Sequence, residues 1–389
     1  MTMRARAREY GIRIGRLEPG PFNAITDVPG VMVGQVTLVE GDGPLVPGRG
    51  PVRTGVTAIR PHPGNLFRDK VAGAAFVLNG FGKTVGLPQV TELGTIETPI
   101  LLTNTLNVGL CADALVQYML AEDPDIGVTV GTVNPVVGEC NDGYLNDIRG
   151  RHVKVGHVLE ALRSAAGGPI QEGAVGAGTG MSCFGWKGGV GTASRRVAPY
   201  TLGVLVVSNF GRPHELIIDG VHVGLELTPP LGPPGPAPSA SPPPAPRAVE
   251  PPAGSIMIVV GTDAPVDSRQ LGRICRRAAA GLARTGSTIG HGSGDFILAF
   301  SNATREPPGD GEFIERTLLR DDGRTMAGLF EAAVEATEEA IIDSLFTAET
   351  MVGRDGHRRE ALPVPDVLRI MDRAGRRPGR PGPGVPTMT

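Results

Sequence analysis

The sequence predicts a layered α/β sandwich, in which helices cover buried sheet. Three observations lead to this fold class. Short apolar runs bounded by glycines recur along the 389 residues, amphipathic helical patterns lie between them, and the two kinds of segment are mixed throughout the chain. Runs of that length between turn residues are typical of buried strands. Strands mixed with helices in this way favour sheets packed against helical layers.

The expected strands are built mainly from Val, Leu, Ile and Ala, because aromatic residues make up only 4% of the chain. Their length and flanking turns separate them from buried helices. They are the segments 74–82, 99–105, 126–133, 201–211, 255–261 and 294–301.

The clearest expected helix covers segment 267–286. Asp267 and Gln270 have the spacing of a capping box there, and Gly286 marks the end. A second helix is expected over 326–348, where apolar side chains form one broad stripe and the acidic side chains fall outside it. Two further helices are expected, over 106–122 and 153–165.

Two proline-rich segments are expected not to pack. Segment 228–254 has the composition of an extended spacer, and segment 376–389 that of a disordered tail. Segment 305–325 is expected to be an exposed loop. The strands in 255–389 would be unstable alone, so we expect this part to complete a single fold with residues 1–254.

Composition excludes several classes of function. A net charge of -3 gives no reason to expect nucleic acid or a membrane surface as a partner. No stretch approaches the roughly 20 apolar residues of a membrane span, and no signal peptide is recognisable, so a cytoplasmic location is expected. The histidines are scattered and no HExxH motif occurs, so neither a metal nor another cofactor is expected. Four well-separated cysteines are expected to be buried free thiols: Cys111, Cys140, Cys183 and Cys275.

The junction between the spacer and a buried strand suggests a chemical step. Ser255 follows Gly254 directly, and a serine hydroxyl can attack the carbonyl carbon of the preceding residue. Hydrolysis of the resulting ester would leave Ser255 as a new amino terminus. Glycine suits the preceding position because it does not hinder attack and tolerates a distorted turn. The new amine, with a pKa of about 7.7–8.0 in model peptides, could then deprotonate its own hydroxyl. A strand that merely begins with serine is the alternative.

Several longer blocks resemble the L-aminopeptidase/D-esterase and β-peptidyl aminopeptidase family. Segments 254–287 and 291–301, the latter reading HGSGDFILAFS, resemble the start of that family's small subunit. Four more blocks occur in the family's order, so the resemblance covers nearly the whole chain. They are NAITDVPGVMVGQVT (23–37), RTGVTAIRPHPGNLF (53–67), VVGECNDGYLNDIRG (136–150) and VLVVSNFG (204–211).

The resemblance implies a four-layer αββα sandwich like that of N-terminal nucleophile hydrolases, with different strand connectivity. It also implies self-cleavage between Gly254 and Ser255 into a large subunit (1–254) and a small one (255–389) that stay together. The cleaved enzyme is expected to hydrolyse N-terminal residues from small peptides, amides and esters, D- or β-residues among them. Homo-oligomers of the cleaved pair are expected.

The resemblance further implies roles for individual residues. Ser255 aligns with the nucleophile, and Asn209 in SNFG aligns with an amide that helps to hold the oxyanion. Ser293 and Asp295 in HGSGD align with a pair that hydrogen-bonds the nucleophile and its amine. Some relatives have glutamate where Asp295 stands, and the aspartate side chain reaches one methylene less far.

Three further residues are candidates on the same grounds. Tyr144 in NDGYLND matches a tyrosine near the scissile bond, and its phenol could donate to the oxyanion during self-cleavage. Glu139 in GECND is the expected anchor for the substrate ammonium, with Asp142 as the alternative. We interpret His291 as a turn histidine near the site rather than as a general base.

Two other functions remain open at this point. An acyltransferase would hand the same acyl-enzyme to an amine, although a serine nucleophile favours water. An uncleaved relative that only binds amino-terminal ligands is the second alternative. The complete set of Asn209, Ser255, Ser293 and Asp295 argues against this loss of chemistry.

Overall fold

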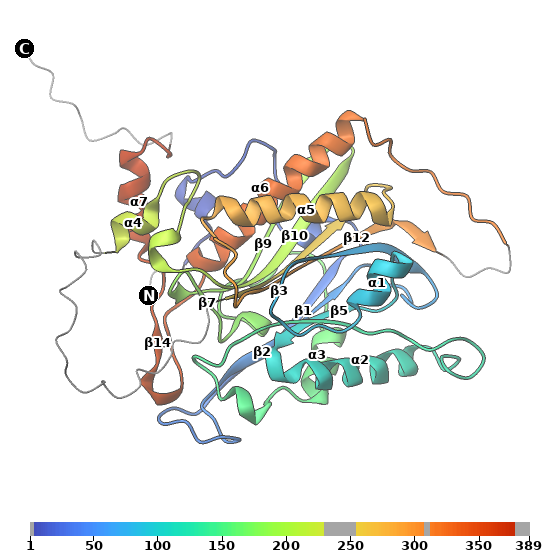
Figure 1. Ribbon diagram of the computed structural model, residues 1–389, viewed down its shortest axis with the longest axis horizontal. Coiled ribbons are helices and arrows are strands. Elements are labelled where there is room, and N and C mark those ends of the chain that lie inside the picture. The colour runs from blue at the N-terminus through green and yellow to red at the C-terminus, as the bar shows by residue number, and fades with distance from the viewer. Residues whose placement is uncertain (1–3, 229–253, 307–311, 378–389) are drawn as a thin grey trace, which may run out of the picture.

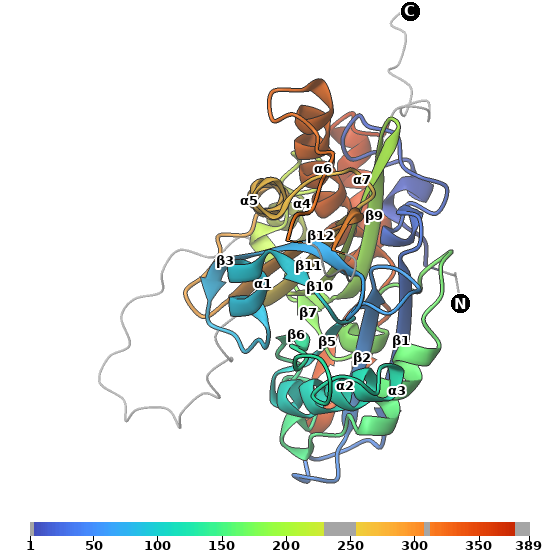
Figure 2. The same cartoon turned by 90° about the vertical axis from the view of Figure 1, so that its right-hand side faces the viewer.

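The computed structural model of the protein describes residues 4–228, 254–306 and 312–377. Two β-sheets lie face to face, and helices cover the outer face of each sheet (Figures 1 and 2). The expected α/β fold class and its four-layer αββα sandwich are confirmed. Residues 229–253 of the expected spacer (228–254) and residues 378–389 of the expected tail (376–389) lie outside the described residues.

The larger sheet has six strands in the spatial order β4 (Thr95–Ile96), β3 (Lys70–Gly80), β12 (Gly294–Glu306), β11 (Ser255–Thr262), β10 (Tyr200–Asn209) and β9 (Gly189–Val197). Strands β11 and β12 run parallel, and the other neighbours are antiparallel. The strand that begins at Ser255 therefore lies in the middle of this sheet, with a hydrogen-bonded strand on each side.

The smaller sheet has four strands in the order β1 (Met32–Glu40), β2 (Val52–Arg60), β5 (Ile100–Asn104) and β6 (Val136–Cys140). Only β5 and β6 are parallel. Because strand side chains alternate between faces, Met257 and Val259 of β11 enter the core between the sheets, whereas Ile256 and Ile258 face the helices. Two short ribbons complete the strands: β7 (Ser182–Cys183) with β8 (Trp186–Lys187), and β13 (Met351–Val352) with β14 (Arg358–Arg359).

Helices α5 (Ser268–Arg284) and α6 (Arg324–Phe346) cover the larger sheet, and α2 (Val108–Glu122) and α3 (Val155–Arg163) cover the smaller one (Figure 1). Helix α6 lies directly on β9 because Gly191 has no side chain: a Cβ there would be 1.9 Å from the carbonyl oxygen of Ala340. The shorter α-helices are α1 (Leu87–Leu93), α4 (Val223–Leu227) and α7 (Val364–Arg373). Short 3₁₀ helices span Ala7–Tyr10, Ile25–Asp27, Thr105–Asn107, Ile148–Gly150, Gly176–Gly178, Pro213–Glu215 and Arg354–Gly356.

The expected start of α5 is confirmed in detail. The Asp267 carboxylate accepts from the Gln270 N–H at 2.7 Å, and the Gln270 side chain accepts from the Asp267 N–H at 3.0 Å. This reciprocal pair satisfies two of the backbone donors that a helix leaves open at its start. The helix ends at Arg284, two residues before Gly286, which has φ +98°.

The expected strand over 126–133 is wrong. The carbonyl oxygen of Asp125 accepts hydrogen bonds from three consecutive N–H groups that follow it, so the apolar run closes into turns. The next strand along the chain is β6, which begins at Val136. An apolar run with glycines is compatible with both outcomes, and the local turn hydrogen bonds decide between them.

Other expectations for the chain are met where the structure describes it. Of the loop expected over 305–325, segment 312–323 contains neither helix nor strand, whereas residues 305 and 306 belong to β12 and residues 324 and 325 to α6. All four cysteines are buried and free. No helix in the described part of the chain is long and apolar enough to cross a membrane.

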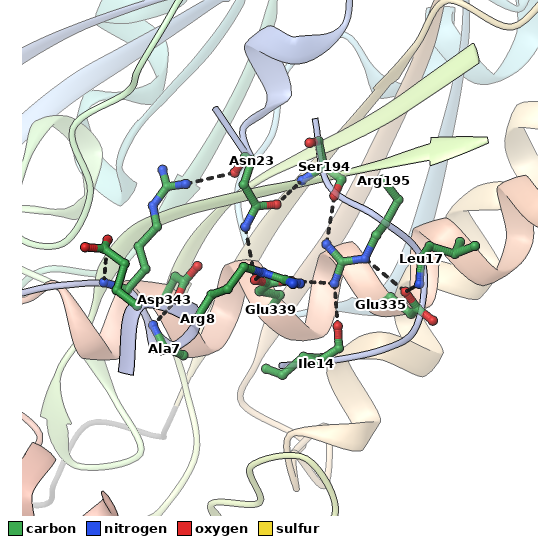
Figure 3. Close-up of polar contacts among 12 residues, drawn as sticks. Ala7, Arg8, Ile14, Leu17, Asn23, Ser194, Arg195, Glu335, Glu339 and Asp343 are labelled. Atoms are coloured by element: carbon green, nitrogen blue, oxygen red, sulfur yellow. Dashed lines mark hydrogen bonds and ion pairs between the residues drawn. The ribbon is translucent and has the colours of Figure 1, made fainter. Parts of the chain in front are cut away.

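The expectation that the acidic side chains of α6 lie outside its buried face is wrong. Glu335, Glu338, Glu339 and Asp343 are each at most 3% exposed. Burial of a carboxylate is costly unless a cation or hydrogen bonds compensate for the lost water. Arg195 of β9, itself fully buried, supplies one such cation: its Nε donates to Glu335 at 2.9 Å, and its Nη2 pairs with Glu339 (Figure 3).

The same carboxylates hold the N-terminal segment on α6. Arg8 pairs with Glu339 at 2.9 Å, and the backbone N–H of Ala7 donates to Asp343 at 2.8 Å (Figure 3). Asn23 donates to Glu339 at 3.0 Å from the opposite side. A buried ionic network thus joins β9, α6 and the start of the chain, which the amphipathic pattern of α6 alone did not reveal.

We expect Arg195→Met to lower the free energy of unfolding by about 3–5 kcal/mol, because the substitution leaves buried Glu335 without a cation and buried Glu339 with Arg8 alone. Denaturant titration followed by circular dichroism measures the change. The control is Arg16→Met: Arg16 pairs with Glu331 at the surface, with 79% of its side chain exposed, and its loss is expected to cost less than about 1 kcal/mol. Equal effects of the two substitutions would contradict a structural role for the buried network.

Candidate active site

A cavity of about 660 Å³ lies where ends of the two sheets meet. The end of β10 and the start of β11 reach it from the larger sheet, and the end of β6 reaches it from the smaller one. Five residues expected at the site line this cavity together: Glu139, Tyr144, Asn209, Gly254 and Ser255.

Ser255 begins β11 with its hydroxyl against the peptide group that precedes it. Its Oγ donates to the carbonyl oxygen of Gly254 at 2.8 Å, and the residue is only 4% exposed. Gly254 has φ +114°, a conformation that residues with a Cβ rarely adopt. An added Cβ would also lie 2.9 Å from the Cβ of Phe210. Position 254 therefore requires glycine for two independent reasons.

A second donor reaches the same carbonyl group. The backbone N–H of Gly294 donates to the carbonyl oxygen of Gly254 at 3.3 Å. The parallel pairing of β11 with β12 places Ser255 opposite Gly294, so the sheet register sets this contact. A backbone N–H in this position polarises the carbonyl group and can stabilise negative charge that develops on its oxygen.

Ser293 and Asp295 lie beside this peptide group. Ser293 Oγ donates to Asp295 Oδ1 at 2.5 Å, and it lies 3.2 Å from the position of a Cβ added to Gly254. The other oxygen of Asp295, Oδ2, is buried without a hydrogen-bond partner among the described residues. Burial raises the pKa of Asp295, and the hydrogen bond from Ser293 opposes this shift. The shorter side chain of aspartate thus does reach Ser293.

Asn209 is the residue of β10 that pairs with Ser255 across the antiparallel ladder. Its side-chain oxygen accepts from the Ser182 N–H at 2.8 Å, and its Nδ2 donates to the Asn141 carbonyl at 3.0 Å. The two contacts fix which end of the amide is the donor. An amide nitrogen carries two N–H groups, so one N–H of the Nδ2 group has no partner among the described residues.

Glu139 lies on the cavity wall at the end of β6 and is 2% exposed. Its carboxylate accepts from the Lys83 backbone N–H at 2.9 Å and from the Thr105 hydroxyl. Burial raises the pKa of Glu139, while these two hydrogen bonds oppose the shift. Asp142, in contrast, is not part of the cavity lining; it is buried beside Asn146, which donates to it at 3.0 Å, and burial raises its pKa to about 7.

Tyr144 lies in a stack of three side chains at the cavity. The Tyr144 ring is stacked on that of His357, with 4.6 Å between the two centroids. The Arg359 guanidinium lies 3.7 Å from the centroid of the Tyr144 ring. His291 lines an adjacent cavity of about 340 Å³ rather than the main one, and its ring lies 6.1 Å from that of Phe81. The interpretation of His291 as a residue near the site is consistent with this position.

The sequence did not reveal the residues that orient the predicted site residues Glu139 and Asn209. Thr105 contacts Glu139, while Ser182 and Asn141 hold Asn209. Lys187 holds the segment that carries Ser182: its buried Nζ donates to the carbonyl groups of residues 178, 181 and 188 at 2.7–3.0 Å. Only Asn141 lies within a block that resembled the family; the others come from distant segments without a recognisable motif.

No metal site emerges from the described ranges. They contain no group of three or more His, Cys, Asp or Glu side chains that could hold a metal ion. The cavity instead brings together a hydroxyl, the Glu139 carboxylate, an amide and backbone N–H donors, and the Asp295 carboxylate lies close behind it; this set is suited to acyl transfer through a serine.

Comparisons with known proteins agree with this arrangement. The chain matches the model of Peptidase family S58 over residues 23–359. The β-peptidyl aminopeptidase BapA of Sphingosinicella microcystinivorans is 42% identical over 372 residues, which cover 94% of this chain and 91% of that protein. A solved protein structure from Pyrococcus horikoshii OT3 is 53% identical with a TM-score of 0.86, covering 96% of this chain and 100% of that one. The L-aminopeptidase D-Ala-esterase/amidase of Ochrobactrum anthropi, a variant of the N-terminal nucleophile hydrolase fold, is 34% identical with a TM-score of 0.84, covering 96% and 99%.

The fold and these matches define a serine-type hydrolase of the N-terminal nucleophile class. The chain belongs to Peptidase family S58. The resemblance inferred from the sequence blocks is thereby confirmed, together with the assignment as a serine aminopeptidase.

Proposed function

We propose that this protein is a self-processing serine aminopeptidase that removes N-terminal residues from small peptides, amides and esters. The observation that carries the proposal is the 2.8 Å contact between Ser255 Oγ and the carbonyl oxygen of Gly254, in a turn with φ +114°. Relatives named as a β-peptidyl aminopeptidase and as an L-aminopeptidase D-Ala-esterase/amidase support this substrate class, and extend it to D- and β-residues.

In the proposed self-cleavage, Ser255 Oγ attacks the carbonyl carbon of Gly254, and the bond from that carbon to the Ser255 nitrogen breaks. The hydroxyl proton passes to this nitrogen, which leaves an ester and a free amine. Water then hydrolyses the ester to the Gly254 carboxylate and the Ser255 hydroxyl. The Gly294 N–H, 3.3 Å from the carbonyl oxygen, stabilises the oxyanion. The products are subunits 1–254 and 255–389.

The subunits stay together because the cut lies at the start of a central strand and leaves the pairing of that strand intact. Strand β11 begins at Ser255 and is paired with β10 of the large subunit along its whole length. Strand β12 of the small subunit is likewise paired with β3 of the large one. Cleavage breaks one peptide bond and leaves both strand ladders intact. Separating the subunits would break these ladders and expose the apolar core that the subunits share.

In the cleaved enzyme, the α-amine of Ser255 serves as general base for its own hydroxyl. Ser293 and Asp295 are the proposed partners of this amine. The buried Oδ2 of Asp295, without a partner among the described residues, supports that role: the ammonium created by cleavage brings donors that the peptide nitrogen did not have.

Asn209 is the proposed oxyanion donor during substrate hydrolysis, because the amide is held rigidly opposite Ser255 with one N–H left over. Tyr144 is the proposed donor to the oxyanion in the self-cleavage step. Glu139 is the proposed anchor for the substrate ammonium, because its carboxylate lines the cavity whereas that of Asp142 does not. A desolvated carboxylate there favours substrates with a free amino terminus.

We expect Ser255→Ala to remain a single full-length chain, because the variant has no hydroxyl to attack Gly254. Wild-type protein is expected to yield two chains, 1–254 and 255–389, in intact-mass spectrometry. Ser164→Ala is the control: this serine is exposed at the end of α3, and its loss should leave processing intact. Two chains from Ser255→Ala would refute the cleavage mechanism.

Asn209→Ala is expected to lower kcat by about 100- to 1,000-fold with little change in KM, because an oxyanion donor acts mainly on the transition state. The same preparation is assayed for processing by gel electrophoresis, so that loss of turnover is measured on cleaved enzyme. Asn134→Ala, an exposed asparagine outside the cavity lining, is the control. A cleaved Asn209→Ala enzyme with wild-type kcat would rule out the assigned role.

The raised pKa of Glu139 leads to a pH dependence of KM. Below this pKa the carboxyl group is neutral and no longer attracts the substrate ammonium, so KM for free-amine p-nitroanilides should rise as pH falls through it. Glu139→Gln should remove the dependence and raise KM on the order of 10- to 100-fold. Asp113→Asn, an exposed acid on α2, is the control. Equal turnover of N-acetylated and free substrates by wild-type enzyme would contradict the anchor.

A further inference from the structure

The cavity carries more positive than negative charge, although the chain as a whole has a net charge of -3. Three cationic side chains line it: Lys83, Arg212 and Arg359. Glu139 is the single carboxylate residue among the lining residues that the structure describes. An anchor for a substrate ammonium accounts for Glu139 but not for three cations, which would repel that ammonium. The surplus indicates that the substrate also brings a negative charge.

Arg359, on β14, is the most firmly oriented of the three. Its Nε donates to the Ser182 hydroxyl at 3.0 Å, and its guanidinium lies 3.7 Å from the centroid of the Tyr144 ring. Tyr144 is in turn stacked on His357, whose Nδ1 lies 2.8 Å from the Tyr144 carbonyl oxygen. These contacts hold the guanidinium plane in one orientation before any ligand binds, which reduces the entropy lost on binding.

The donors of Arg359 are only partly used. Among the described residues, the contact with Ser182 is its one hydrogen bond, and no acidic side chain lies within ion-pair distance of it. The neighbouring Arg358 differs: it is not among the residues that line the cavity, and it pairs with Glu360. A guanidinium with free N–H groups at the wall of a cavity matches the two oxygens of a carboxylate.

A chain of contacts links Arg359 to the nucleophile. Arg359 contacts Ser182 through the hydroxyl, and the Ser182 N–H donates to the side chain of Asn209, which pairs with Ser255. The other end of the Asn209 amide contacts Asn141, which lies two residues after Glu139. The oxyanion donor thus stands between the segment that carries Glu139 and the segment that contacts Arg359.

We propose that Arg359 binds a carboxylate on the leaving-group side of the substrate, so that the preferred substrates are dipeptides with a free carboxyl terminus. This inference rests on the proposed aminopeptidase function. Glu139 takes the ammonium of the first residue, the scissile carbonyl faces Ser255 and Asn209, and the α-carboxylate of the second residue reaches Arg359. A dipeptide spans about 7 Å from end to end, a length that a cavity of about 660 Å³ accommodates.

The test compares three substrates that share β-Ala as their first residue and differ in whether, and where, the second residue carries a carboxylate. They are β-Ala-Ala with a free carboxyl terminus, β-Ala-Ala amide, and β-Ala-Asp amide, which carries its carboxylate on the side chain. For wild-type enzyme we expect kcat/KM to be about 10- to 100-fold higher for the free acid than for the neutral amide, as a charge-assisted bidentate contact provides. A preference for β-Ala-Asp amide over the free acid would locate the recognised carboxylate on the side chain and overturn the dipeptide assignment.

Arg359→Gln should bring the ratio of the two kcat/KM values close to one, and Arg359→Lys should keep part of it. The ratio is the informative readout, because Arg359 also supports Ser182 and a purely structural role would lower both values equally. Arg358→Gln is the matched control, with an unchanged ratio expected. A wild-type ratio near one, or a ratio that survives in Arg359→Gln, would overturn the inference, even if that variant processed itself more slowly. Failure of cleaved wild-type enzyme to hydrolyse any of the three substrates, or p-nitroanilides, would instead contradict the proposed function.

Discussion

The structure depends on one contact, between the hydroxyl of Ser255 and the carbonyl group that precedes it. That contact exists because Gly254 adopts φ +114° in a space where a side chain would collide with Phe210. A serine at the start of an ordinary strand would not face its own preceding peptide group in this way. Three features act on the peptide bond between Gly254 and Ser255: the turn at Gly254, the register that brings the Gly294 N–H to the Gly254 carbonyl group, and the burial of Ser255.

The four-layer fold explains how residues from distant segments reach this bond. Three neighbouring strands of the larger sheet contribute Asn209, Ser255 and the Gly294 segment at one level, because their register aligns an end of β10 with the starts of β11 and β12. The smaller sheet brings Glu139 to the same place at the end of β6. A rigid core between the sheets therefore sets the spacing between Ser255 and Glu139.

The sequence allowed much of this to be predicted, and the failures have physical reasons. Segments with strong local signals were found correctly, such as the capping box of Asp267 and Gln270. The run over 126–133 was not, since its apolar residues fit a strand while local hydrogen bonds to the Asp125 carbonyl form turns. The acids of α6 were misjudged because Arg195 and Arg8, the cations that pair with Glu335 and Glu339, lie far away in the sequence.

The residues of the candidate site likewise fall into a group that the sequence predicts and a group that it does not. The residues within motif blocks could be named, whereas their orienting partners Thr105, Ser182 and Arg359 could not, because only the folded chain brings them to the cavity. Trapping with hydroxylamine at neutral pH tests the central claim most directly, since it cleaves esters under these conditions, whereas its attack on an Asn-Gly peptide bond such as Asn79-Gly80 requires alkaline pH. Added to freshly purified uncut protein, it should yield a large fragment that ends in a Gly254 hydroxamate and a small one that begins at Ser255. Cleavage at another bond, or fragments without any hydroxamate under these conditions, would contradict an ester formed on Ser255.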